Sequence, residues 1–366
     1  MKKKIVILCA VLLAVLLPMR VHGVGAYDDT VNLTLAEAHE LILEGLPAIW
    51  DLESHLYDLN YTRNEMDIEF RRYVRGRTRD IVNAWNRKSI ELDREIAVVE
   101  MNIEVLALRT KFVLHTTVAN IIGAEMDIDT AEASIAIERE NLRHVTLRHR
   151  LGLASASDLR AANTRINQAY MNLDNLHTAA AIARESLNEL LGLAACQYVI
   201  IEFERILPEI PEDLAYYITQ KVLQTPTARR MQITVNRYQE ELAWHQYNCI
   251  YSRRRRNECE TCETLTESHK RAVIDRDLEI RRMEVALRIT YNRLEQLQTG
   301  EMAARLALEL GLYNLEMVKT NYDLGRVTQL DVDRAAMSLA VLEQTIERNL
   351  YQQWLLKITI NNPELL

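Results

Sequence analysis

The sequence predicts an all-α protein built from two tandem copies of one unit of long coiled-coil helices. The 366 residues include only 10 glycines and 6 prolines, so turns are few and the elements between them must be long. Hydrophobic residues make up 48% of the chain but aromatic residues only 6%, which favours helices packed through alanine and aliphatic side chains. The order of helix breaks in the first half also returns in the second half, which indicates an internal repeat.

The N-terminus has the pattern of an export signal. Residues 2–4 are lysines, residues 5–17 form an apolar run, and residues 24–26 are the small-residue sequence Val-Gly-Ala. We therefore interpret residues 1–26 as a signal peptide, with an uncleaved anchor as the alternative. No later stretch is expected to reach the length and apolarity of a membrane helix.

Each copy is expected to begin with a short amphipathic helix, followed by a break and a long helix. The first copy opens with LTLAEA at residues 33–38, and the second opens with PEDLA at residues 211–215. After the break, Pro47 and Pro226 stand where a helix can begin, because proline suits the first helical position.

Each copy also contains a glycine at which a long helix should end, because glycine accepts left-handed dihedral angles. These glycines are Gly152 in HRLGLASASD and Gly325 in YDLGRVTQLD. Ser157 or Asp158 is expected to cap the helix that follows the first turn. The two repeats are placed at residues 27–206 and 207–366.

Coiled-coil periodicity marks the helix after the first glycine turn. Apolar residues follow one another there with strict spacings of three and four positions, which predicts one buried face. These residues are Leu159, Ala162, Ile166, Ala169, Leu173, Leu176, Ala180, Ala183, Leu187 and Leu190. Before the turn, residues 78–150 contain no proline, so a single helix of about 110 Å is expected. Rods of that length suit a tube or stalk.

At these residues the sequence resembles the TolC family of outer-membrane efflux proteins. The resemblance is carried by LTLAEA, by the two glycine turns with an aspartate six positions later, and by LNELLG at residues 187–192. It implies a homotrimer whose helices enclose a passive duct in the cell envelope. It also implies two partners, a periplasmic adaptor (a membrane-fusion protein) and an inner-membrane pump. A structural coiled-coil protein of the envelope without conduction is the alternative function.

The resemblance also implies roles for residues near the glycine turns, which would form the periplasmic tip of the duct. Asp331 would line the mouth, where three copies form an acidic ring that attracts cations. Asp158 and Tyr322 would lie where neighbouring helix pairs are linked in the closed tip. Plain helix capping is the alternative for both aspartates. The sequence departs from the family pattern at Val327 and Arg334.

The windows that correspond to the family's membrane strands are residues 62–82 and 247–271. Neither alternates between apolar and polar residues as a membrane strand does, and both resemble charged turns that join helices. We therefore expect the β-barrel strands to be missing. The arginine-rich turns are candidates for contact with the outer membrane or another envelope layer, with solvated turns as the alternative.

Three cysteines lie in or beside the second of these windows. For an exported chain, a disulfide from Cys249 to Cys259 or Cys262 is favoured over zinc binding, and free thiols are the other alternative. We expect no cofactor, no metal site and no enzyme activity, because no catalytic constellation is visible. A formal net charge of −8 argues against nucleic-acid binding.

Overall fold

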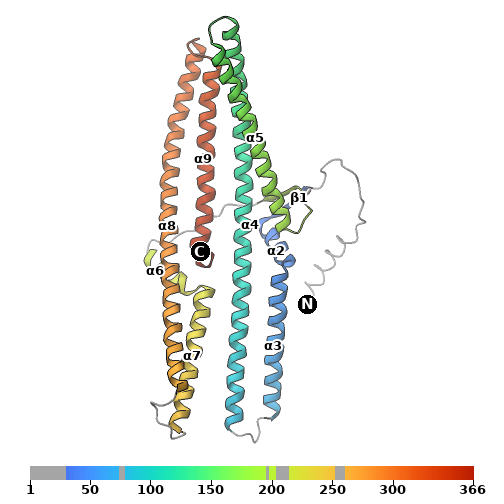
Figure 1. Ribbon diagram of the computed structural model, residues 1–366, viewed down its shortest axis with the longest axis vertical. Coiled ribbons are helices and arrows are strands. Elements are labelled where there is room, and N and C mark those ends of the chain that lie inside the picture. Colours follow the sequence, from blue (N-terminus) through green and yellow to red (C-terminus); the bar gives the residue numbers. More distant parts are fainter. Residues whose placement is uncertain (1–29, 74–78, 195–197, 203–213, 252–259) are drawn as a thin grey trace, which may run out of the picture.

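A computed structural model describes residues 30–73, 79–194, 198–202, 214–251 and 260–366 of the chain. The predicted signal peptide, the boundary between the two repeats and Cys259 lie outside these residues. The described part consists almost entirely of long helices, which confirms the all-α prediction (Figure 1).

The elements of the first half are β1 (Thr30–Thr34), α2 (Leu35–Gly45), α3 (Pro47–Tyr73), α4 (Arg79–Arg150), α5 (Ala156–Leu190) and β2 (Tyr198–Glu202). Those of the second half are α6 (Leu214–Leu223), α7 (Pro226–Tyr251), α8 (Glu260–Asp323), α9 (Gln329–Asn361) and η2 (Pro363–Leu365). Both predicted proline starts are therefore confirmed, because α3 and α7 begin at Pro47 and Pro226.

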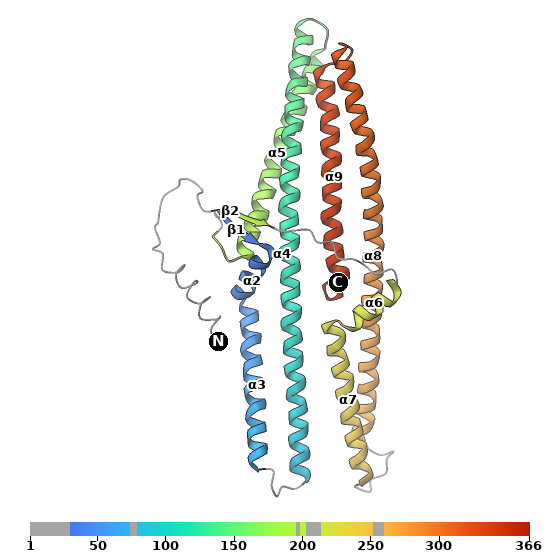
Figure 2. The same cartoon turned by 180° about the vertical axis from the view of Figure 1, so that it is seen from behind.

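Two continuous rods organise the molecule. Helix α4 has 72 residues and α8 has 64, so they extend about 108 Å and 96 Å at 1.5 Å per residue. Two shorter helices pack along each rod, α3 and α5 on α4, and α7 and α9 on α8 (Figures 1 and 2). The shorter helices match in length between the halves, with 27 and 26 residues for α3 and α7 and 35 and 33 for α5 and α9. The same arrangement of one long helix and two shorter ones thus occurs twice.

The buried face of α5 is the one that the heptads predict. All ten apolar residues of the predicted stripe are buried or half-buried, and Ala162, Ile166, Ala180 and Leu187 are fully buried. Burial of this face against α4 removes aliphatic surface from water, which stabilises the hairpin more than helix propensity does.

Each copy has its own hydrophobic core at the level of its short first helix. In the first copy, α2 inserts Ala38 and Ile42 beside Leu114 of α4 and Leu187 of α5. In the second copy, α6 contributes to a cluster around Leu287 of α8 in the same way. The short first helix of each copy, α2 or α6, therefore fixes where the two shorter helices of that copy meet the long one.

Strands β1 and β2 were not predicted from the sequence. They pair in parallel, with Thr30 opposite Tyr198 and Thr34 opposite Glu202. Because β1 precedes α2 and β2 follows α5, this pair ties the start of the first copy to its end. Such a pairing depends on residues far apart in the chain, which local patterns do not reveal.

The windows expected to lack membrane strands are helical wherever the structure describes them. Helix α3 continues to Tyr73 and α4 begins at Arg79, while α7 ends at Tyr251 and α8 begins at Glu260. Of the charged segments that the sequence predicts as turns, residues 71–79 and 252–263, the structure describes residues 71–73, 79 and 260–263, which are helical, and the others lie outside the described residues.

One expectation about membrane helices is wrong. Within the described residues, α4 is long and apolar enough over part of its length to cross a membrane, judged by length and composition only. A packed core helix passes the same test, and α4 packs on α3, α5, α7 and α9.

Candidate functional site at the tip turns

The first tip turn, between α4 and α5, is a Schellman motif centred on Gly152. Gly152 has a φ of 71°, which is favourable for glycine and strained for other residues. Its N–H donates to the carbonyl of His149 at 3.0 Å, and the N–H of Leu153 donates to the carbonyl of Arg148 at 2.7 Å. These bonds satisfy the last carbonyls of α4 and turn the chain back sharply.

The second tip turn, between α8 and α9, has the same geometry. Gly325 has a φ of 68°, its N–H donates to the carbonyl of Tyr322 at 2.8 Å, and the N–H of Arg326 donates to the carbonyl of Asn321 at 2.9 Å. Both predicted glycine turns thus lie at the same end of the molecule (Figures 1 and 2).

Asp158 belongs to the cap of α5. The cap residue is Ser155 and not Ser157 or Asp158, so that detail of the sequence prediction is wrong. Asp158 accepts hydrogen bonds from the N–H and the hydroxyl of Ser155, both at 2.8 Å, while its own N–H donates to the Ser155 hydroxyl at 3.1 Å. This reciprocal arrangement is a capping box.

Asp331 occupies the same place at the start of α9. Its carboxylate accepts from the N–H of Thr328 at 2.9 Å and from the Thr328 hydroxyl at 2.7 Å. Arg334 approaches the same carboxylate at 3.9 Å from the next turn of the helix. In the single chain each tip aspartate therefore binds back to the residue that caps its helix.

Hydrogen bonding keeps both tip carboxylates ionised. The bonds from the backbone and hydroxyl of Ser155 lower the pKa of Asp158, and those from the hydroxyl and backbone of Thr328 lower the pKa of Asp331. Tyr322, which was predicted to lie with Asp158 at the link between neighbouring helix pairs, is an exposed side chain in the last turn of α8. The tip of one chain thus presents two carboxylates and an exposed phenol at one end of the rods.

His115, which the sequence analysis did not single out, lies where the two copies meet. His115 belongs to α4, and its ring stacks on that of Trp354 of α9, with the two ring centroids 4.7 Å apart. His115 is only 5% exposed, and among the described residues neither ring nitrogen has a hydrogen-bond partner. The pKa of His115 is lowered to about 4. Burial of the ring is the largest cause, and charge repulsion from the nearby Lys111 and His39 adds to it. The ring is therefore neutral near pH 7 and acts as an aromatic packing residue.

Ion pairs hold the remaining length of the contact between the copies. On the side of the rods away from the tip, Arg94 of α4 pairs with Glu240 of α7, and Glu104 of α4 pairs with Arg229 of α7 at 2.7 Å. Nearer the tip, Arg348 of α9 pairs with Asp127 of α4. We call this line of contact, from α4 to α7 and α9, the internal seam.

A groove of about 810 Å³ lies along the internal seam between α4, α7 and α8. Charged side chains in its wall already bind one another. Arg229 pairs with Glu104, and Arg276 pairs with Asp277 and donates to the amide oxygen of Gln232 at 2.7 Å. These groups stabilise the wall of the bundle.

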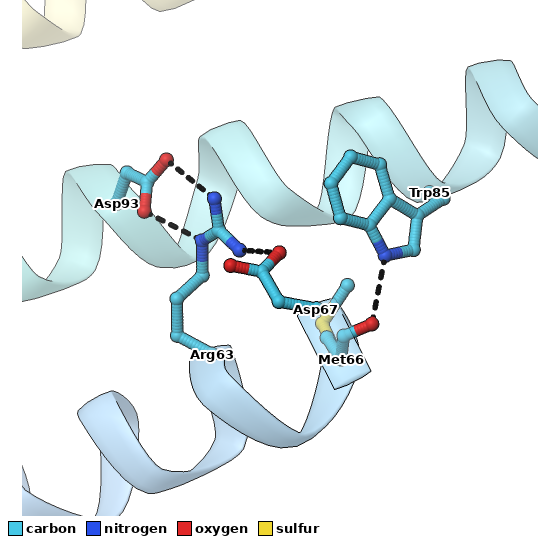
Figure 3. Close-up of polar contacts among 5 residues, drawn as sticks. All are labelled: Arg63, Met66, Asp67, Trp85 and Asp93. Carbon is cyan, nitrogen blue, oxygen red and sulfur yellow. Dashed lines mark hydrogen bonds and ion pairs between the residues drawn. The ribbon is translucent and has the colours of Figure 1, made fainter. Parts of the chain in front are cut away.

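A polar and aromatic cluster fastens α3 to α4 near the end opposite the tip (Figure 3). Arg63 donates to Asp93 at 2.7 Å and to Asp67 in the next turn of its own helix. Trp85 donates its indole N–H to the carbonyl of Met66 at 3.2 Å and stacks on Phe70 at 4.0 Å between centroids. The cluster joins the first hairpin where the described part of α4 begins.

The predicted disulfide stays a prediction. Cys262 is half-buried in the first turn of α8, but Cys259 and the side chain of Cys249 lie outside the described residues. Within the described residues no group of three or more His, Cys, Asp or Glu side chains is arranged to hold a metal ion.

No protein-family model matches the chain, and no curated protein sequence matches it significantly.

Solved structures do match the fold. CusC, whose structures concern transmembrane channel formation, aligns with a TM-score of 0.68 and 12% identity over 95% of this chain and 96% of its own. The CmeC outer-membrane channel of Campylobacter jejuni aligns at 0.63 and 9% identity, covering 95% and 93% of the two chains. The open state of the MtrE outer-membrane channel of Neisseria gonorrhoeae aligns at 0.60 and 12% identity, covering 94% and 95%. The neighbours are channels, and they match the chain over nearly its whole length. The two glycine-turned hairpin copies therefore give this chain the fold of the TolC-type outer-membrane channels.

Proposed function

We propose that the chain is the wall of a passive helical duct in an efflux or secretion system of the cell envelope. The observation that carries the proposal is the pair of equivalent rods, each with two shorter helices and a turn at the same end. Walls built from repeated antiparallel helices can close around a channel, and the alignment with outer-membrane channels over 95% of the chain supports that use of the rods.

Three copies in a ring would give six hairpins around one lumen. The duct would receive cargo at the tip from an adaptor and an inner-membrane pump, because the matched folds are those of outer-membrane channels. The chain would supply no catalysis. Its contribution would be a path, a gate and docking surfaces.

The gate is assigned to the tip. Three copies of Asp331 would bring three carboxylates together at the mouth, where they attract cations and repel one another. Arg334 at 3.9 Å offsets part of that charge in each copy. Asp158 and Tyr322 would contribute to the contact between neighbouring hairpins that holds the tip closed.

Conductance tests the role of Asp331. In channels reconstituted from purified chain, Asp331→Ala is expected to weaken block by divalent cations by about tenfold, because the carboxylate ring is removed. Thr328→Ala is the matched control, since it removes the cap hydroxyl and keeps the carboxylate. Unchanged block in Asp331→Ala channels would remove Asp331 from the gate.

Transport in cells tests the duct itself. Deletion of the gene is expected to raise the accumulation of a fluorescent efflux dye at least twofold, and the wild-type chain should reverse the rise. Unchanged accumulation of dyes and unchanged protein secretion would favour the second candidate, a structural coiled-coil protein of the envelope. That candidate is favoured by the helical ends of α3 and α7, which occupy windows where a membrane channel of this fold would place strands.

A further inference from the structure

The second hairpin carries a basic groove between α7 and α8, in the half of α8 that lies away from the tip. The groove has a volume of about 440 Å³, and its wall includes Arg230 of α7 and Arg271 and Arg276 of α8. Asp275 is the carboxylate in the same wall, so three arginines against one aspartate give the lining a formal charge of +2. The groove therefore has the size and the charge to hold an organic anion.

The first copy fills the equivalent position with a hydrophobic core. Three aliphatic side chains of α3 and α4 are buried or half-buried there, namely Leu59, Val99 and Ile103. The repeat offsets, which are fixed by the two proline starts and the two glycine turns, place them on Tyr238, Ala272 and Arg276. An alanine in place of the valine removes volume, and an arginine in place of the isoleucine brings in charge. A groove thus opens in the second copy where the first copy is packed.

The other two arginines are also specific to the second copy. The same offsets place Arg230 on Asp51 and Arg271 on Val98. The first hairpin has the same helices as the second without a basic groove at this position, so packing of the hairpin does not require these arginines. A binding role accounts for them where a packing role does not.

The arginines of the groove differ in how many of their N–H groups are already used. Arg276 is held in place, because it pairs with Asp277 and donates to the amide oxygen of Gln232 at 2.7 Å. Arg230 makes one long hydrogen bond of 3.5 Å, to Asn102 of α4. Arg271 is exposed and makes no hydrogen bond or ion pair with the described part of the chain. Arg230 and Arg271 therefore have N–H groups free for a ligand.

We propose that this groove binds a phosphate group through Arg230 and Arg271, with an apolar part of the same ligand against Met231, Tyr238 and Ala272. A guanidinium presents a planar fork of N–H groups that matches two phosphate oxygens. A phosphate monoester carries a charge of about −1.5 to −2, which balances the charge of the lining. The phosphate is carried either by an envelope lipid or by a soluble phosphate ester. The site does not depend on the proposed duct.

Titration calorimetry on the purified chain tests the groove. Phosphatidic acid with short chains, kept below its micelle concentration, is expected to bind. Phosphatidylcholine of the same chain length should bind at least tenfold more weakly, because its choline group balances the phosphate charge. Arg271→Gln should weaken the binding of phosphatidic acid by about tenfold, as expected for the loss of a charge-assisted hydrogen bond. Thermal unfolding of this variant should match that of the wild type, since Arg271 holds no neighbour.

Arg282→Gln is the matched control for the charge. Arg282 lies on the same helix outside the groove, is exposed and pairs with Glu279 at 3.0 Å, so its loss should leave the binding of phosphatidic acid within twofold. Equal binding by the Arg271→Gln and Arg282→Gln variants would overturn the proposal. Absence of binding to the wild-type chain by every phosphate-bearing probe would also overturn it.

Glycerol phosphate in place of the lipid distinguishes the two sources of the phosphate. Binding as tight as that of phosphatidic acid, and weakened equally by Arg271→Gln, would assign the site to a soluble phosphate ester. Much weaker binding would assign it to a lipid, because the apolar wall then contributes to affinity. Neither measurement involves transport, so a failed efflux assay would overturn the duct and leave the phosphate site intact.

Discussion

The tip of the molecule is held by contacts between residues close together in sequence, whereas the body of its rods is held by contacts between residues far apart in sequence. At the tip, each copy is organised by residues within a few positions of one another, and the two turns share the same glycine geometry and the same capping box. Along the rods, the defining contacts join residues that are far apart, such as Arg63 with Asp93 and His115 with Trp354. There the copies differ. The repeat offsets place Arg63 and Asp93 on Leu242 and Thr266.

The local structure of the tip turns is therefore common to both copies, whereas the contacts along the rods are specific to one copy. A turn at the end of a rod needs the same local chemistry wherever it occurs. The sides of the rods must instead fit different neighbours, because α4 packs on α7 and α9 of the second repeat, whereas the described part of α8 packs mainly on α6, α7 and α9 of its own repeat.

The largest predicted effect concerns the buried histidine of the internal seam. The pKa of His115 is lowered from 6.5 to about 4 in the folded chain, so the unfolded chain binds the proton first as the pH falls. Stability should therefore decrease between pH 6.5 and pH 4, by up to about 3 kcal/mol at 1.36 kcal/mol per pKa unit. His115→Phe keeps the stack on Trp354 and should remove this slope in urea unfolding. An unchanged slope in the variant would show that His115 is not its source.

The cluster at the far end of the first hairpin should be next in size. Trp85→Ala removes the stack on Phe70 and the hydrogen bond to Met66, so we expect a loss of about 2 kcal/mol, below the range for a fully buried tryptophan. Trp244→Ala, which removes an indole from the corresponding region of the second copy, should cost about half as much, because Trp244 is held mainly by Arg87 over its ring. Equal losses would mean that the copies are not specialised there.

The glycine turns should respond equally in the two copies. Gly152→Ala and Gly325→Ala each force a side chain into a left-handed conformation, so each should cost about 1 kcal/mol in thermal unfolding. Gly123→Ala is the matched control in the interior of α4, where nothing lies within 4 Å of the added methyl group. It should stabilise the chain by about 0.5 to 1 kcal/mol. A destabilising Gly123→Ala would contradict the continuous rod.

The caps should give the smallest effect. Ser155→Ala and Thr328→Ala should each cost about 0.5 to 1 kcal/mol, as expected for lost N-caps. Because the folded-state pKa values of Asp158 and Asp331 are lowered, the capping contribution is present above the unfolded-state values and is lost as the pH falls through the folded ones. Carboxyl NMR titration of wild type and Ser155→Ala should show the pKa of Asp158 returning toward its usual value. An unchanged pKa of Asp158 in the Ser155→Ala variant would contradict the capping box.

The same contrast explains what could be predicted from the sequence. The glycine turns, the proline starts and the buried face of α5 each follow from spacing within a few residues, and the structure confirms them. The cap residue was misplaced by two positions, because several serines compete for that role in ASAS.

Contacts between distant residues escaped the sequence analysis. Strand β2 is a run of five residues that pairs with β1 only because α5 returns the chain to that level. The stack of His115 on Trp354 and the bond from Arg63 to Asp93 require helices to be placed side by side, and no local pattern encodes their register.

Electron cryo-microscopy of the purified mature chain tests the central claim most directly. The account predicts closed rings of copies around a hollow axis, with Gly152 and Gly325 of every chain at one end of the tube. Single chains, or dimers with tip turns at opposite ends, would contradict it.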